Sequence, residues 1–159
     1  MKKLVIIGAN DFQNQLILKA KSLGYETHVF AWEEGAVGKS TADYFYPISI
    51  VEKEEILDKC KQIKPDGVCS IASDLASITV NYVAENLGLP CNKMKYSAIQ
   101  TNKYKMREAF MAAGLPCPKF VLADENFDES QVKDFRFPII VKPTDRSGSR
   151  NIMKLESTD

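Results

Sequence analysis

Apolar and polar positions across residues 1–90 follow strand and helix patterns in turn. The apolar run 4–7 ends at a glycine and predicts a strand buried on both faces. After it, Asn10 or Asp11 can cap a helix that carries apolar residues at helical spacing until Gly24. This unit of strand and helix recurs along the chain. It therefore favours an α/β fold with a parallel sheet and right-handed crossovers.

The same spacing predicts the other elements of this portion. Strands are expected at 27–32, 44–48 and 68–71, with a polar loop at 33–43. Each helix should carry one apolar face that packs against the sheet. The apolar positions are Phe12, Leu16, Ala20 and Leu23 in the first helix, Ile56, Cys60 and Ile63 in the second, and Ala76, Val80, Val83, Ala84 and Leu87 in the third.

The pattern changes after Pro90. A helical turn is expected at 96–99, and Thr101 or Asn102 can cap a helix that ends at Gly114. A strand at 120–122 and a short helix at 129–135 should follow. The positions expected to face inward on the longer helix are Met106, Ala109, Phe110 and Ala113.

Two last predicted strands, 137–143 and 152–155, would form a hairpin. A hairpin alone cannot bury a face, so its apolar residues should be exposed or covered by another chain. We therefore expect a domain that begins here and continues in the natural chain beyond Asp159. The apolar residues concerned are Ile139, Val141, Ile152 and Leu155.

Composition narrows the class of protein. The 159 residues are 45% hydrophobic and 26% charged, with 21 basic and 21 acidic residues, as in an ordinary soluble protein. No basic block interleaves with aromatic residues, and no apolar run could span a bilayer, so neither nucleic acid nor a membrane is an expected partner. Four widely spaced cysteines favour reduced thiols in a cytoplasm. The single histidine, His28, lies in a predicted strand, so histidine-dependent triads and metal sites are not expected.

The most specific chemistry lies around Lys142, at the end of a predicted buried strand. A buried lysine is costly unless an anion meets it. The loop that follows combines small residues with two arginines, and its backbone N–H groups could hold a polyphosphate. A solvated turn with a lysine that reaches water explains the same residues equally well. The loop residues are Ser147, Gly148, Ser149 and Arg150.

Lys103 opens the helix that ends at Gly114. A lysine at this end opposes the helix dipole, which would make sense if an anion lay close by. Taken alone, the segment is better explained as a capped surface helix with ordinary lysines.

Together, the segments TNKYKMREAFMAAGLPCP (101–118) and FPIIVKPTDRSGSRN (137–151) resemble the ATP-grasp ligases. The resemblance covers the whole chain. It implies a Rossmann-like pre-ATP-grasp domain at 1–92, then a linker helix and an incomplete N-terminal subdomain of the ATP-grasp fold at 93–159. The chain most resembles carboxylate–amine ligases similar to the large subunit of carbamoyl phosphate synthase.

This resemblance implies roles for the residues above. Lys103 would approach the phosphates of ATP, Lys142 would contact the α- and β-phosphates, and the loop would close over the triphosphate as Ser147, Gly148, Ser149 and Arg150. Asn151 departs from the family pattern, which commonly has glycine there, but asparagine tolerates a left-handed backbone.

The resemblance also implies the reaction and its partners. ATP would convert a carboxylate into an acyl phosphate, and a nitrogen donor would then displace the phosphate. Magnesium would bridge the phosphates, with its ligands beyond Asp159, so we expect this chain alone to be inactive and leave its catalytic residues unassigned. A homodimer is one candidate assembly.

Four residues are weaker candidates for the acceptor-substrate side: Gly8, Asn10, Ser73 and Asp74. They follow the first and fourth predicted strands, at the carboxyl edge of the sheet, where ligands of open α/β folds gather. Ser73 or Asp74 should cap the helix after the fourth strand, and for Asp74 a plain N-cap is the favoured explanation.

Two other functions stay open. A nicotinamide-dependent oxidoreductase would use Glu33 after the second strand, but Asn10 replaces the second glycine of Gly-x-Gly-x-x-Gly. The chain could also be a complete, non-catalytic small-molecule binding module, or half of a split ligase.

Overall fold

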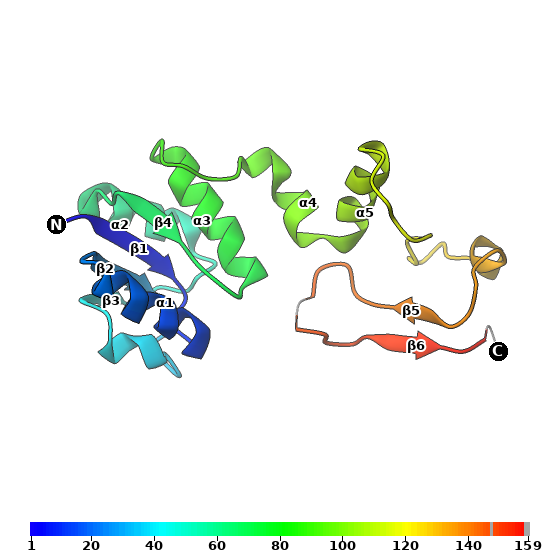
Figure 1. Cartoon of the computed structure of the whole chain (residues 1–159), viewed down its shortest axis with the longest axis horizontal. Coiled ribbons are helices and arrows are strands. Elements are labelled where there is room, and N and C mark those ends of the chain that lie inside the picture. The colour runs from blue at the N-terminus through cyan, green and yellow to red at the C-terminus, as the bar shows by residue number, and fades with distance from the viewer. Residues whose placement is uncertain (147, 158–159) are drawn as a thin grey trace. The chain divides into compact units, whose positions relative to one another are not determined.

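The computed structural model describes residues 1–146 and 148–157 (Figure 1). The chain divides into two compact units, Met1–Ser97 and Ala98–Asp159, each with its own sheet. In the described residues, no helix combines the length and the apolar character needed to cross a membrane.

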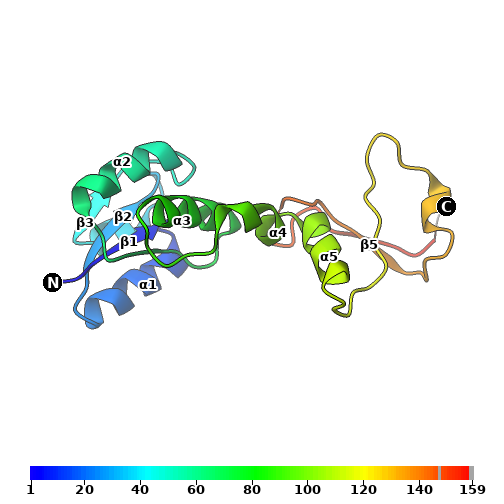
Figure 2. The same cartoon turned by 90° about the horizontal axis from the view of Figure 1, so that it is seen from above.

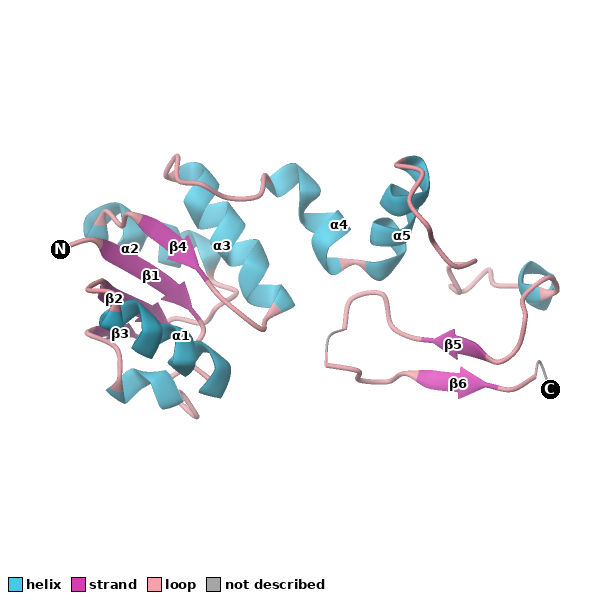
Figure 3. Ribbon diagram, in the orientation of Figure 1, coloured by secondary structure: helices cyan, strands magenta, loops and turns pink. Residues whose placement is uncertain are grey.

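The first unit is built on a four-stranded sheet in the order β3-β2-β1-β4, and every pair of neighbours is parallel (Figure 3). The predicted α/β class with a parallel sheet is therefore confirmed. Pairing of Ile7 with Phe30 and of Ile6 with Cys69 aligns the carboxyl ends of three strands. The strands are β1 (Lys3–Ile7), β2 (Glu26–Phe30), β3 (Tyr44–Tyr46) and β4 (Gly67–Cys69).

Helices cover both faces of this sheet (Figure 2). Alternate residues of a strand point to opposite faces. Ile6 therefore packs with α1 (Asp11–Ser22), while Val5 and Ile7 pack with α2 (Lys53–Ile63) and α3 (Asp74–Asn86). A short 3-10 helix, η1 (Val37–Ser40), lies in the loop between β2 and β3.

The apolar face predicted for α2 is buried. The face predicted for α1 is right at Ala20, which is buried, and at Leu16, which packs against the core, but wrong at its two ends. Phe12 and Leu23 are 64% and 62% exposed. The buried residues are Gln13, Ile17 and Ala20. Spacing alone favoured the apolar Phe12, whereas the fold places the polar Gln13 in the interior, where its amide has hydrogen-bond partners.

Asp43 ties the start of β2 to α1. Its carboxylate accepts hydrogen bonds from the backbone N and the Oγ1 of Thr27, at 2.8 and 2.9 Å, and from Lys21 Nζ at 2.7 Å. The bond from Lys21, and then the backbone bond from Thr27, lower the pKa of Asp43 from 3.8 to about 2. Because the folded-state pKa is depressed, the carboxylate stabilises the fold above about pH 4, and this contribution is lost as pH falls through 2.

We therefore expect Asp43→Asn to lower the free energy of unfolding by about 1 kcal/mol at pH 7, since the partly exposed pair is weakened by solvent. The deficit should shrink between pH 4 and pH 2, as urea unfolding at each pH would measure. Asp58→Asn is the matched control, because Asp58 also pairs with a lysine, Lys61, at 2.8 Å, but on the exposed face of one helix. A deficit that does not change with pH would contradict the assignment.

The second unit begins within α4, after the 3-10 helix η2, and has a single hairpin as its sheet. Strands β5 and β6 are antiparallel, with Ile140 opposite Lys154. The strand expected at 120–122 is not formed, and no described residue of α5 is fully buried. The elements are η2 (Met94–Tyr96), α4 (Ser97–Thr101), α5 (Lys103–Ala112), η3 (Glu129–Val132), β5 (Ile139–Val141) and β6 (Met153–Leu155).

The apolar side chains of the hairpin are largely accessible to solvent, as predicted for two strands that cannot bury a face by themselves. Ile152 and Leu155 are exposed, and Ile139 and Val141 are half-buried. Among the described residues after Ser97, Val132 is the only hydrophobic side chain in the buried core.

Candidate functional site

The start of α5 lies directly against the loop that follows β5. The backbone N of Lys103 donates a hydrogen bond to the Thr144 carbonyl at 2.8 Å. Its Nζ donates to the carbonyl of Arg146, 43 residues away in the sequence. Two segments that the sequence suggested separately therefore form one local structure.

Capping fixes this end of α5. Asn102 is the N-cap, and its side chain accepts a hydrogen bond from the Lys105 backbone N at 3.0 Å. Lys105 pairs with Glu108 at 3.0 Å on the helix surface. Lys103 is thus the lysine of this turn that reaches the loop, and its ammonium group meets a neutral carbonyl. An anion entering the loop would be a stronger partner for that ammonium group.

Lys142 comes directly after β5, and its side chain is exposed. The expectation that it ends a buried strand is wrong, because β5 is only half-buried in a unit whose sheet has two strands. Within the described residues, the ammonium group of Lys142 has no ion-pair or hydrogen-bond partner. It is therefore available to an anion.

Three described residues of the loop after Lys142 have a left-handed backbone conformation. Gly148, Ser149 and Asn151 have φ values of 69°, 54° and 55°. Asn151 adopts the conformation expected of it in place of glycine. Backbone turns of this kind can gather N–H groups into a concavity that binds anions. Arg150 is exposed beside them, and Ser147 lies outside the described residues.

At the carboxyl edge of the first sheet, the predicted substrate-side residues occupy helix starts. Asn10 caps α1, and its side chain accepts from the backbone N of Phe12 at 3.0 Å, while Gly8 has a φ of 100°. Ser73 caps α3, accepting from the Ala76 backbone N at 3.2 Å. Of the two residues expected to cap this helix, Ser73 is therefore the N-cap, and the capping role favoured for Asp74 is wrong. The extended backbone at Ser73 gives its hydroxyl the capping position, which leaves Asp74 exposed as the first helical residue.

Gln13, which the sequence analysis missed, joins two loops of this edge. Its Nε2 donates to the carbonyl of Ile71, after β4, and its Oε1 accepts from the backbone N of Asn10 at 3.1 Å. A Cβ at Gly8 would come within 3.1 to 3.2 Å of the Gln13 side chain, and the φ of 100° is one that side chains rarely adopt, so glycine fits best there. The signal available in the sequence was the capping box formed by an Asn and a Gln three positions later.

The described residues contain no group of three or more His, Cys, Asp or Glu side chains that could hold a metal ion. Burial raises the pKa of Cys60 to about 12 and that of Cys69 to about 11, so both are protonated thiols at neutral pH.

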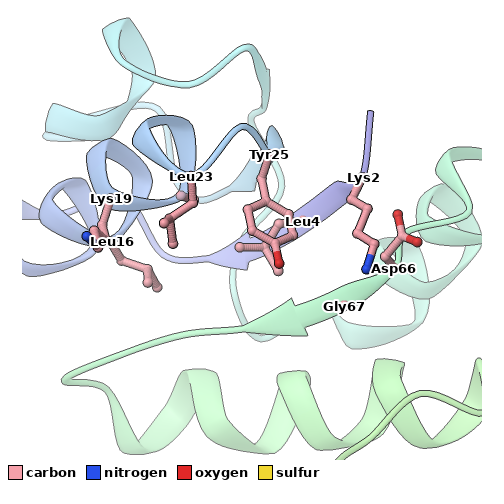
Figure 4. Close-up of a pocket in the computed structure, with 9 residues that line it drawn as sticks. Lys2, Leu4, Leu16, Lys19, Leu23, Tyr25, Asp66 and Gly67 are labelled. Atoms are coloured by element: carbon pink, nitrogen blue, oxygen red, sulfur yellow. The ribbon is translucent and has the colours of Figure 1, made fainter.

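A cavity of about 350 Å³ lies at the opposite, amino-terminal edge of the sheet (Figure 4). None of the predicted site residues lines it. Its walls are mostly apolar, with two lysines and one aspartate at the rim. The lining consists of Lys2, Leu4, Leu16, Lys19, Ala20, Leu23, Tyr25, Asp66 and Gly67.

No known family profile matches the chain, but individual proteins do. It is 27% identical over 146 residues to a formate-dependent phosphoribosylglycinamide formyltransferase of Prochlorococcus marinus, covering 89% of this chain and 37% of that protein. It is 35% identical over 82 residues to D-alanine–D-alanine ligase B of Chromobacterium violaceum, covering 49% of this chain and 27% of that protein.

The fold agrees with these relatives. The ADP complex of N5-carboxyaminoimidazole synthetase from Staphylococcus aureus matches 99% of this chain and 42% of its own, with a TM-score of 0.83 and 16% identity. These proteins are ATP-grasp ligases, so the predicted resemblance and the fold of their N-terminal part are confirmed. The chain spans well under half the length of each.

Proposed function

We propose that this chain is the N-terminal part of an ATP-dependent ligase that joins a carboxylate to an amine. The observation that carries the proposal is the contact of Lys103 with the loop after Lys142. It gathers two lysines and a left-handed turn in one small unit, and such an arrangement suits a polyphosphate.

Each residue has a distinct part in this proposal. Lys103 exchanges the Arg146 carbonyl for a phosphate oxygen, and Lys142 neutralises the α- and β-phosphates. Ser147, Gly148, Ser149 and Arg150 cover the triphosphate. Positioning and charge neutralisation of this kind are the main contributions a protein makes to phosphoryl transfer.

We further propose the division into a pre-ATP-grasp domain at 1–92 and an ATP-grasp portion at 93–159. Magnesium, held by residues outside the described part, would bridge the phosphates. Four further points stay predictions: the closer likeness to the large subunit of carbamoyl phosphate synthase, the inactivity of this chain alone, the homodimer and the cytoplasmic location.

Trapping with hydroxylamine tests the proposed reaction. An enzyme that forms an acyl phosphate should convert its carboxylate substrate into a hydroxamate when hydroxylamine replaces the amine. The complete protein, supplied with ATP, magnesium and a panel of carboxylates, should give one hydroxamate per phosphate released. Phosphate release with no hydroxamate from any carboxylate would contradict an acyl phosphate mechanism.

A further inference from the structure

The cavity at the amino-terminal edge of the first sheet lies on the face that α1 covers (Figure 4). Alternate residues of a strand share a face, so Leu4 and Gly67 lie on the same side as Ile6 and Cys69, which pack in the cluster of α1. The helices α2 and α3 pack on the other face. The lining of the cavity therefore comes from α1 and from the first residues of β1 and β4, with no second helix over them.

Gly67 leaves the floor of this cavity without a side chain. It is the first residue of β4 and does not have the left-handed backbone that favours glycine, so the backbone itself does not demand glycine there. A Cβ at Gly67 would come within 3.3 Å of Leu4 Cδ1, the nearest atom of the same lining. Glycine weakens a strand, and in a strand it often marks a place where a ligand approaches the backbone closely.

The walls of the cavity offer apolar surface to a ligand. Leu23 is 62% exposed, and Leu4, Leu16 and Tyr25 are half-buried at the margin of the core. The hydroxyl of Tyr25 has no hydrogen-bond partner in the described part of the chain. A volume of about 350 Å³ lies in the range of small-molecule sites, so a ligand body the size of one aromatic ring fits between these side chains.

The ends of the cavity carry positive charge. Figure 4 shows Lys19 at one end and Lys2, beside Asp66, at the other. Neither ammonium group has an ion-pair or hydrogen-bond partner among the residues that the structure describes. The carboxylate of Asp66 already accepts a hydrogen bond from the Lys3 backbone N at 2.7 Å. Two ammonium groups and one carboxylate leave one net positive charge in the lining.

The neighbouring groups do not reverse this charge. Glu26 lies opposite Lys3 in the sheet, but its carboxylate bonds to His28 at 2.8 Å on the face of α2 and α3. The only acidic residue of α1 is Asp11, at the far end of the helix. The carbonyl of Ala20, in the last turn of α1, accepts backbone hydrogen bonds from the residues that follow the helix, so its negative end is capped.

We propose that this cavity binds a small carboxylate with an apolar body, of the arylalkanoate class. Lys19 meets the carboxylate, and the leucines and Tyr25 cover the body where it lies over Gly67. A single carboxylate balances the one net positive charge of the lining, whereas a phosphate dianion would exceed it. None of the residues assigned to ATP lines the cavity, so this ligand is additional to the substrates of the proposed reaction.

Titration of the chain with hydrocinnamate, followed by backbone amide NMR, tests the proposal. We expect saturable shifts at Gly67 and Tyr25. Hydrocinnamate should bind at least about 10-fold more tightly than the neutral hydrocinnamamide, which lacks the charge, and than propionate, which lacks the ring. No saturable shift at these two residues, or equal binding of either comparison compound or of inorganic phosphate, would overturn the inference.

A charge variant locates the carboxylate. Lys19→Met should weaken hydrocinnamate binding by at least about 5-fold and leave hydrocinnamamide binding unchanged, because it removes the ammonium group and keeps an apolar stem. Lys61→Met is the matched control, since Lys61 occupies the last turn of α2 as Lys19 occupies that of α1, but lines no part of the cavity. Equal losses in both variants, or no loss in Lys19→Met, would overturn the inference.

A second variant tests the floor of the cavity. Gly67→Ala should weaken hydrocinnamate and hydrocinnamamide alike, by at least about 5-fold, because the new Cβ and the displaced end of Leu4 occupy space that the ligand body needs. The fold should persist, since the backbone at Gly67 is open to alanine, and urea unfolding would confirm it. Full affinity in a folded Gly67→Ala variant would overturn the inference.

The titration contains no ATP, so its outcome is independent of the nucleotide site. Failure of hydrocinnamate to bind would remove this inference alone and would leave the hydroxamate test of the ligase intact. Binding of hydrocinnamate without hydroxamate formation would remove the proposed ligase function and leave the cavity as a carboxylate site.

Discussion

Replacing Lys142 with alanine should weaken ATP binding by about 10- to 100-fold, because a hydrogen bond between a charged donor and phosphate contributes about 1.5 to 3 kcal/mol. In the complete ligase, turnover should fall by at least about 100-fold, since the same charge faces the transferring phosphates. Titration with ATP, followed by steady-state phosphate release, would measure both. The fold should survive, because the side chain is exposed and has no partner among the described residues.

Lys154→Ala is the matched control for this experiment. Lys154 lies on the same hairpin, opposite Ile140, and it pairs with Glu156 at 2.7 Å. It carries the same charge but is not part of the loop. Equal losses in both variants would mean that ATP responds to the general charge of the hairpin. Unchanged affinity in Lys142→Ala would show that the role assigned to Lys142 is wrong.

Periodicity predicted the first unit well because its strands and helices pack face to face in a regular way. The buried faces of α2 and α3 follow directly from helical spacing. It failed at the two ends of α1, where Phe12 and Leu23 have the right spacing but are exposed. A polar residue in a core cannot be recognised by spacing, since its burial depends on partners elsewhere in the chain.

The second unit was predicted less well because few of its described side chains are buried, so its helices and strands have no packed face that a periodic pattern could indicate. The segment 120–122 has strand-forming residues but pairs with neither strand of the hairpin, so it stays irregular. The contact of Lys103 with Thr144 and Arg146 joins distant segments, and no local pattern encodes it. The resemblance to ATP-grasp ligases implied only that Lys103 and the loop would both approach the phosphates of ATP.

Gln13→Ala should be the most destabilising substitution at the carboxyl edge, lowering the free energy of unfolding by about 3 kcal/mol. The change removes the donor to the Ile71 carbonyl and the acceptor for the Asn10 backbone N. It also leaves a space in the interior, because Gln13 is only 1% exposed. Urea unfolding followed by Trp32 fluorescence would measure the loss within the first unit.

Gln15→Ala separates this effect from the loss of a glutamine as such. Gln15 lies two residues further along α1 and is exposed, so its replacement should change stability by no more than about 0.5 kcal/mol.

Gln13→Glu adds a second comparison, because a carboxylate can still accept from Asn10 but cannot donate to Ile71 when ionised. If the link between the two loops carries the stability, Gln13→Glu should resemble Gln13→Ala and should speed hydrogen exchange at 70–74. If Gln13→Ala is no worse than Gln15→Ala, the loops are held by other contacts, such as the bond from Ser70 Oγ to the Ile7 carbonyl at 2.5 Å.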